Sequence, residues 1–293
     1  MMANKLEMIK ELRARTNSAL VDVKKALEAT EYDMEKAIAW LKENGIVKAA
    51  KKAGRIAAEG VVAAYGDEKN AILIEVNSET DFVVKNEKFT KLVNDLTPAI
   101  YNAGAKTLEE ALKVTLANND TVEAALTDAT AVIGEKITLR RIKHIQATEN
   151  QVLGIYVHTN QQVAAVVKVE GSNVEAARNV AMHVSAMNPE FTLESDMPAE
   201  KIEEIKARFE KPAGFDSKPA GVQEKIVSGW YNKQLSEFVL SHQPFVMDDG
   251  LTVEKYLANH GCKLVKAYRF EVGEGIEKVQ TNFAEEVAAA AKI

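Results

Sequence analysis

The segment Glu75-Val76-Asn77-Ser78-Glu79-Thr80-Asp81-Phe82-Val83 gathers carboxylate, hydroxyl and aromatic side chains where an apolar, strand-like run gives way to a helical pattern. An oxygen of Ser78, Thr80 or Asp81 can accept hydrogen bonds from the first amides of that helix. Phe82 is followed by Phe89 and Leu96 at seven-residue intervals, so the three side chains could share one core-facing stripe. Periodicity alone therefore favours a helix cap and a core ring over a contact site.

No motif for covalent catalysis accompanies this segment. A nucleotide hydrolase needs a glycine-rich phosphate cradle followed by Lys and Ser or Thr, and the chain has no such run. The nearest approach to a dinucleotide fingerprint, Gly273-Glu274-Gly275-Ile276, lacks the third glycine. No serine nucleophile elbow occurs either. We therefore expect no catalytic site for covalent chemistry.

Metal and cofactor signals are also missing from the sequence. Cys262 is the single cysteine, and the histidines do not fall at metal-ligand spacing. They are His144, His158, His183, His242 and His260. We expect no metal and no cofactor bound by the chain itself.

Composition is that of a soluble, cytoplasmic protein. Hydrophobic residues make up 46% of the chain and charged residues 27%, and the apolar runs are too short to cross a bilayer. The N-terminus has no secretory signal pattern. Residues 1–58 hold twelve Lys or Arg against eight Asp or Glu, whereas the whole chain carries −6. This basic segment is either a solvated surface or a contact for an acidic protein or a nucleic acid.

Three short amphipathic helices are predicted in residues 1–55. Their apolar positions recur at helical spacing. These are Leu6, Ile9 and Leu12, then Leu20, Val23 and Leu27, then Met34, Ile38 and Leu41. Thr16, Asn17 and Ser18 offer caps for the second helix, and Asn44-Gly45 predicts the end of the third.

A ββα unit follows and recurs about ninety residues later. The first hairpin turns at residues 66–70 and the second follows Gly154, with each hairpin followed by an amphipathic helix. The repeat predicts an α+β fold with a two-lobed core. We assign the first lobe to residues 56–149 and the second to 150–190 and 241–275.

Two helical stretches with little apolar content fill residues 191–240 and are separated by Pro212-Ala213-Gly214 and Pro219. They predict a projecting antiparallel helical hairpin, or coiled coil, inserted into the second lobe. Self-association through this hairpin is possible. An alanine-rich C-terminal helix is expected in residues 276–293.

Four motifs in order along the chain resemble the bacterial elongation factor Ts family, the exchange factors for elongation factor Tu. They are LRARTNSALVDVKKAL at 12–27, EVNSETDFV at 75–83, QPFVMDDGLTV at 243–253 and RFEVGEGIEK at 269–278. The chain departs from the family pattern at residues 17–21, where the family has small residues and methionines, and at Val84.

The resemblance implies a guanine nucleotide-exchange factor that binds elongation factor Tu with GDP and disturbs its Mg²⁺ and phosphate site, so that GTP can rebind. It implies that residues 1–55 form a UBA-like (ubiquitin-associated) module that docks on the partner, with Arg13, Leu20 and Val21 at contact positions. It also implies that Thr80, Asp81, Phe82 and Val83 form the wedge that releases the nucleotide. This reverses the core assignment of Phe82 made from periodicity.

Two other classes stay open on the residues alone. Three-helix modules also recognise ubiquitin-like proteins or bind RNA through basic faces. An undetected hydrolase or transferase would need titratable groups that meet only in the folded chain. The partner that co-purifies, and turnover by the isolated protein, distinguish these classes.

Overall fold

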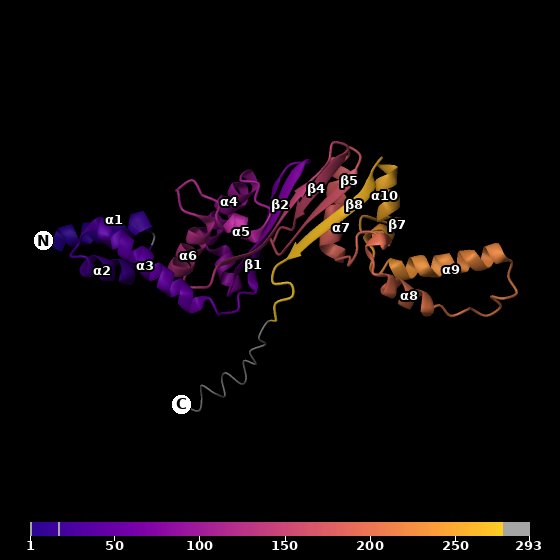
Figure 1. Cartoon of the computed structure of the whole chain (residues 1–293), viewed down its shortest axis with the longest axis horizontal. Helices are drawn as coiled ribbons and strands as arrows, with labels where there is room; N and C mark the ends of the chain where they lie inside the picture. Colours follow the sequence, from indigo (N-terminus) through magenta and orange to yellow (C-terminus); the bar gives the residue numbers. More distant parts are fainter. Residues whose placement is uncertain (1, 17, 278–293) are drawn as a thin grey trace, which may run out of the picture.

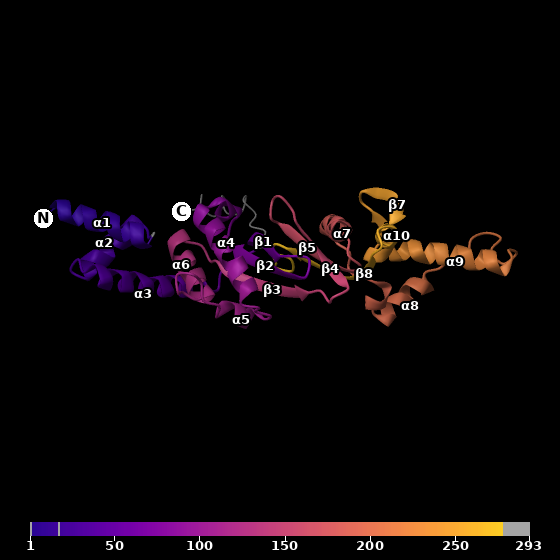
Figure 2. The same cartoon turned by 90° about the horizontal axis from the view of Figure 1, so that it is seen from above.

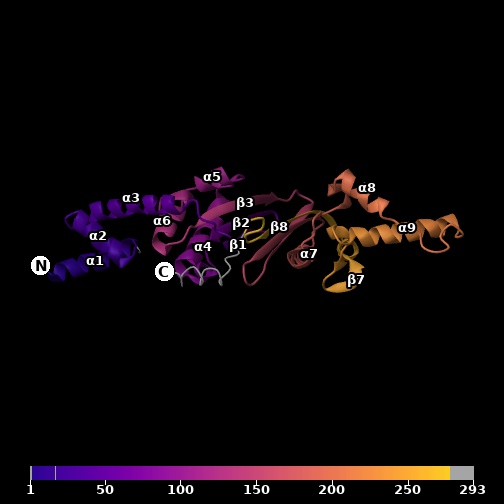
Figure 3. The same cartoon turned by 90° about the horizontal axis from the view of Figure 1, so that it is seen from below.

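The computed structural model describes residues 2–16 and 18–277 of the 293-residue chain. The elements follow one long axis, with α1–α3 at one end, two small sheets in the middle, and α8 and α9 at the other end (Figure 1). Views from above and below show the same order (Figures 2 and 3). The helix predicted over residues 276–293 lies, from residue 278 onward, outside the described residues.

The first end of the molecule consists of α1 (Met2–Thr16), α2 (Leu20–Ala29) and α3 (Met34–Lys52). Their common core contains Leu12, Val23 and Leu27, as the helical spacing predicted. The expected stop at Asn44-Gly45 is wrong, because α3 runs on to Lys52. At Gly45, α3 crosses α6 so closely that an added Cβ would lie 3.3 Å from the Cβ of Ala131. This packing overrides the weak stop signal of an isolated glycine.

The start of α2 also differs from the expectation. Its N-cap is Ala19, which offers no side-chain hydrogen bond to the helix. The hydroxyl of Thr16 instead donates to the carbonyl of Leu12, one turn back in α1.

Two three-stranded antiparallel sheets form the middle of the molecule. The first has the order β1 (Glu59–Gly66), β2 (Asn70–Ser78), β3 (Thr138–Gln146). The second has the order β4 (Gln151–Val157), β5 (Val163–Glu170), β8 (Lys263–Glu271). The sheets pack face to face through a shared cluster that includes Val62, Leu73, Leu153 and Val166. The chain is therefore an α+β protein.

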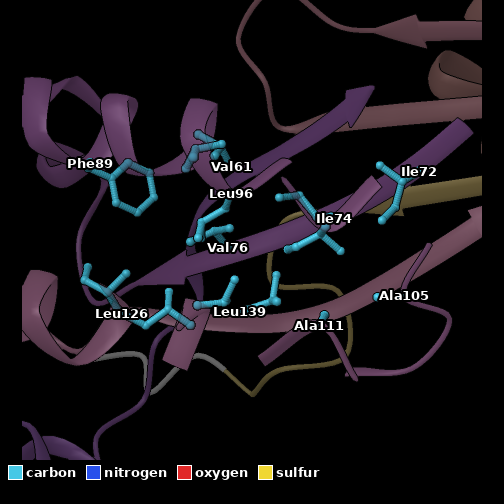
Figure 4. Packing of buried hydrophobic residues seen from close by; sticks show 14 of the residues in the cluster. Val61, Ile72, Ile74, Val76, Phe89, Leu96, Ala105, Ala111, Leu126 and Leu139 are labelled. Carbon is cyan, nitrogen blue, oxygen red and sulfur yellow. The ribbon is translucent and has the colours of Figure 1, made fainter. Parts of the chain in front are cut away.

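Helices cover the outer face of the first sheet. A short 3-10 helix, η1 (Asp81–Lys85), precedes α4 (Glu87–Asn102), and α5 (Leu108–Leu112) and α6 (Val122–Ile133) follow. Phe89 and Leu96 of α4 point toward Val61 and Val76 of the sheet, with Leu126 nearby (Figure 4). This core contacts the end of β2 through Val76 and the following turn through Val83.

The second sheet carries α7 (Val174–Met187) and α10 (Val253–Asn259) on its outer face. The backbone of α7 touches β4 at Gly154, where an added Cβ would lie 2.1 Å from the carbonyl carbon of Ala177. The sequence repeat thus corresponds to β1-β2-α4 in one lobe and β4-β5-α7 in the other. Between α9 and α10 come η3 (Leu240–His242) and a small hairpin of β6 (Pro244–Phe245) and β7 (Asp248–Thr252).

After α7 and η2 (Glu194–Asp196), the helices α8 (Ala199–Ala207) and α9 (Ala220–Leu235) project beyond the second sheet (Figure 1). A small cluster at their base includes Met197, Ile205, Leu235 and Val239. Farther out, Phe209, Phe215 and Trp230 stack edge to face and line an open groove of about 690 Å³. Self-association through this segment stays a prediction. None of the helices in the described part of the chain is both long and apolar enough to cross a bilayer.

Candidate functional site

The end of β2 leads into an exposed aromatic side chain. Phe82 lies in the first turn of η1 and is 79% exposed, and Asp81 beside it is also exposed. Asn86 is extended and separates η1 from α4, whose first residue is Glu87. The heptad that placed Phe82 with Phe89 and Leu96 is therefore interrupted, since the two rings lie on different elements. The core assignment of Phe82 from periodicity is wrong.

The capping expectation for this segment is wrong as well. Asn86 caps α4 by accepting a hydrogen bond from the amide of Lys88. The hydroxyl of Ser78 donates to the carbonyl of Thr80 at 2.9 Å, and Thr80 makes no side-chain cap bond to η1. These oxygens therefore stabilise the turn before η1 rather than the helix.

Of the four side chains predicted to form the wedge, the structure buries some and exposes others. Val83 is 5% exposed and packs in the core with Phe89 and Val93, so its side chain is not available to a partner. Thr80 is half-buried and engaged with Glu135. Only Asp81 and Phe82 project outward, while Val83 anchors the turn behind them.

Two acidic side chains clamp this turn to the loop between α6 and β3. Glu135 accepts the amide of Thr80 at 2.9 Å through Oε2 and its hydroxyl at 2.7 Å through Oε1. Glu79 in return accepts the amide of Lys136 at 2.7 Å. Arg55, just after α3, forms an ion pair with Glu79 at 3.2 Å. Sequence reasoning missed this clamp because its partners lie 24 to 57 residues apart in the chain.

A buried carboxylate farther back on β2 connects the two lobes. Glu75 has no exposed surface and accepts hydrogen bonds from Arg140 at 3.0 Å, Arg141 at 2.5 Å and the amide of Gly273 at 2.8 Å. Gly273 follows β8, so this one side chain holds the end of the second sheet against the first. Burial raises the pKa of Glu75, but the hydrogen bonds from Gly273, Arg140, Asn77 and Arg141 outweigh it and hold that pKa below its ordinary value.

Gly273, the first glycine of the weak phosphate motif, has this structural use instead. Gly273 has φ +71°, and an added Cβ would lie 2.3 Å from the carbonyl oxygen of Ala58. The backbone therefore approaches Ala58, the residue before β1, in a way that only glycine allows, and its amide donates to Glu75.

The residues predicted in the first module are accessible. Arg13 is exposed on α1, Leu20 is 43% exposed and Val21 is 62% exposed at the start of α2. They belong to the end of the molecule formed by α1–α3 (Figure 1), whereas Asp81 and Phe82 lie on η1, which follows β2. The structure thus places the two exposed sets on different elements, one on α1 and α2 and the other on η1.

Comparison with known proteins agrees with the four motifs. The model of the family described as Elongation factor TS matches residues 79–274. Proteins named Elongation factor Ts are similar over almost the full length of both chains. That of Mycoplasmopsis synoviae (strain 53) is 65% identical and covers 100% of each chain. That of Mycoplasmopsis pulmonis (strain UAB CTIP) is 49% identical and covers 99% of each.

The chain belongs to the elongation factor Ts family. Membership identifies it as a translation elongation factor. The family model begins at residue 79, so its match includes the Thr80–Val83 turn, Glu135 and the second lobe.

A third family motif, residues 243–253, forms a hairpin on the second lobe. Val246 and Met247 at its tip are 49% and 58% exposed. The buried His183 holds the hairpin on both sides of β6, because the Val246 amide donates to Nδ1 at 3.1 Å and Nε2 lies 2.9 Å from the side-chain oxygen of Gln243. With Nδ1 accepting, Nε2 must carry the proton, so the ring is neutral. Burial lowers the pKa of His183, which favours the same form.

Groups that could hold a metal do not occur at any of these places. Within residues 2–16 and 18–277, no three His, Cys, Asp or Glu side chains cluster with suitable geometry. The groups that the site offers to another molecule are the exposed ring of Phe82 and the exposed carboxylate of Asp81, on a turn held by hydrogen bonds. Such a site can displace groups in another molecule by contact.

Proposed function

We propose that this chain is a guanine nucleotide-exchange factor that binds elongation factor Tu with GDP and promotes GDP release, after which GTP rebinds. The supporting observation is the exposed pair Asp81 and Phe82 on a turn that is anchored at both ends. Val83, the residue after the ring, is buried, and Thr80, two residues before the ring, is hydrogen-bonded to Glu135. A large apolar side chain that is 79% exposed on a braced turn is suited to entering a partner.

The mechanism is mechanical rather than covalent. A translational GTPase holds GDP through a glycine-rich loop and through Mg²⁺ that bridges protein and phosphate. Asp81 and Phe82 enter beside that site and displace groups that hold the metal and phosphate. Both Mg²⁺ and GDP belong to the partner, and this chain supplies neither cofactor nor catalytic residue.

Linkage sets the thermodynamics of exchange. If this chain weakens nucleotide binding by some factor, the nucleotide weakens the binding of this chain by the same factor. The nucleotide-free complex is therefore tight, and GTP expels the exchange factor. Because no membrane or nucleic acid enters this cycle, a cytoplasmic location and a protein partner alone are sufficient for it.

The ring cannot supply all of the free energy needed. Weakening nucleotide binding by a factor of about 10⁴ requires about 5.5 kcal/mol of differential binding. Burying one phenyl ring contributes about 1.5–3 kcal/mol. Other contacts must share the task, while the exposed Arg13, Leu20 and Val21 are proposed to dock the partner through the first module.

The test is release of fluorescent GDP from elongation factor Tu in a stopped-flow instrument. Phe82→Ala should slow exchange by about ten- to a hundredfold and leave a measurable complex, since other contacts remain. Tyr65→Ala is the control, because Tyr65 is a 46% exposed aromatic residue at the other end of the β1–β2 hairpin. Wild-type rates with Phe82→Ala would remove the ring from the mechanism, and absence of any acceleration by the wild-type chain would refute the function.

A further inference from the structure

We infer that Glu135 is a positioning residue for nucleotide exchange: it holds the turn before Phe82 so that the ring projects at a fixed angle. This inference rests on the proposed function and adds to it a residue in the loop between α6 and β3, outside the four sequence motifs. Both carboxylate oxygens of Glu135 accept hydrogen bonds from Thr80, so its inferred role is to hold Thr80.

The first support is where the pairing of β2 and β3 ends. The last backbone pair of the two strands is Asn77 with Thr138. Beyond it, carboxylates replace carbonyls as the acceptors: Glu79 binds the amide of Lys136, and Glu135 binds the amide of Thr80. The two turns thus exchange hydrogen bonds as a strand pair would. Side-chain hydrogen bonds therefore continue the pairing of β2 with β3 as far as Thr80.

The second support is that every polar group of Thr80 has a partner in this arrangement. Its amide and hydroxyl both donate to Glu135, and its carbonyl accepts the hydroxyl of Ser78. Hydrogen bonds to an ionised acceptor are shorter and stronger than neutral ones. Thr80 therefore has little freedom to rotate, and Phe82 follows it by only two residues.

The third support is that Glu135 is itself held in place. Gly134 ends α6 with φ +90°, in the left-handed conformation that favours glycine. The amide of Ile137 donates to the buried hydroxyl of Thr130 in α6 at 3.0 Å, and Ile137 is 3% exposed. The loop is anchored on both sides of Glu135, so force on the ring is transmitted to α6 and the first-lobe core.

The clamp also includes the connection from the first module. Arg55 pairs with Glu79, and Lys136 donates through Nζ to the carbonyl of Arg55 at 2.9 Å. These bonds connect the end of α3 to the turn that carries Phe82. A contact of α1–α3 with a partner is therefore linked to the position of the ring. Substitution of Glu135 should therefore lower the maximal exchange rate more than it lowers the affinity for the partner.

The experiment compares Glu135→Ala, Phe82→Ala and the double variant in the fluorescent-GDP release assay over a range of exchange-factor concentrations. Misplacement of a group by about 1 Å can cost up to about a hundredfold in rate, and we expect Glu135→Ala to reduce the maximal exchange rate about tenfold. The concentration for half-maximal rate should change by less than about threefold. Glu123→Ala is the charge-matched control, because Glu123 is exposed on α6.

The double variant separates positioning from an independent contact. If Glu135 acts through the ring, Phe82→Ala with Glu135→Ala should be within about twofold of Phe82→Ala alone. Multiplicative effects, or a wild-type maximal rate with Glu135→Ala, would overturn the inference. If Phe82→Ala itself exchanges at the wild-type rate, the proposed function of the ring fails first, which is a distinguishable result.

A second variant guards against a general loss of structure. Glu135→Gln keeps the size of the side chain and one acceptor oxygen for Thr80, but it removes the charge that strengthens both bonds. Its maximal rate should fall between those of the wild type and Glu135→Ala, with the same thermal midpoint as the wild type within about 2 °C. If the exchange rates of the variants instead follow their thermal midpoints, Glu135 contributes to stability alone.

Discussion

The substitution Glu75→Gln tests whether one buried carboxylate holds the two lobes together. Glu75 has no exposed surface, and its oxygens accept hydrogen bonds from Arg140, Arg141, Asn77 and Gly273. Glutamine has nearly the same shape but replaces one oxygen with an NH₂ group. That group would face arginine donors, and the charge that both arginines require would be lost.

The expected cost follows from the burial of each partner. Removing one member of a buried ion pair costs about 3–5 kcal/mol when the other members stay buried. The side chains of Arg140 and Arg141 are 27% and 29% exposed, so water can partly satisfy them after the change. We therefore expect Glu75→Gln to lower the free energy of unfolding by about 2–3 kcal/mol at neutral pH.

The effect should depend on pH with a definite sign. The pKa of Glu75 in the folded protein is below its ordinary value of 4.5, because the hydrogen bonds that it accepts outweigh the opposing effect of burial. A carboxylate with a lowered pKa contributes stability that is complete above its unfolded pKa and is lost as the pH falls through the folded pKa. The difference between wild type and Glu75→Gln should thus be constant from pH 7 to about pH 5 and shrink below about pH 4.5.

Urea unfolding followed by circular dichroism at several pH values measures this difference. Glu68→Gln is the matched control, because Glu68 is exposed in the β1–β2 turn of the same sheet. A loss below about 0.5 kcal/mol at pH 7 would show that the Glu75 network does not stabilise the fold. A difference that stays constant to pH 3.5 would show that the charge of Glu75 is not its cause.

The remaining predictions concern helix packing and the first module. Gly154→Ala should destabilise the fold by about 3 kcal/mol in thermal or urea unfolding, because the new Cβ would lie 2.1 Å from the backbone of α7. Gly221→Ala, in an open position on α9, should be neutral or stabilising by up to about 1 kcal/mol, and equal losses in the two variants would contradict the close packing at Gly154. Arg13→Ala with Leu20→Ala should raise the concentration for half-maximal exchange about tenfold at an unchanged maximal rate. A fall in the maximal rate alone would show that these exposed residues act on the nucleotide rather than on docking.

The order of elements and the family were accessible from local sequence. Alternating and helical periodicities predicted the two hairpins, their helices and the three helices of the first module, because such patterns reflect which face of each element is buried. The four motifs identified the family, since they are contiguous stretches of the chain. The exposed positions of Leu20 and Val21 are consistent with their predicted role.

The environment of Phe82 depended on the tertiary structure. Its seven-residue spacing from Phe89 is correct along the chain, but the 3-10 helix and the extended Asn86 break the helical phase between them. The ring is therefore exposed, while its neighbour Val83 is buried. A change of phase over five residues leaves no mark in a periodic pattern, so sequence could assign this ring only through the family.

The bracing of the site was likewise decided by folding. Sequence alone determined that a strand carrying Glu75 leads into a turn with Thr80, Asp81 and Phe82, because those are neighbours in the chain. Only the tertiary structure brought Glu135 to Thr80 and Gly273 to Glu75, across 55 and 198 residues. Hydrogen bonds act over about 3 Å whatever the separation along the chain. The hydrogen-bond partners of Thr80 and Glu75 are therefore determined by the pairing of β2 with β3 and by the stacking of the two sheets.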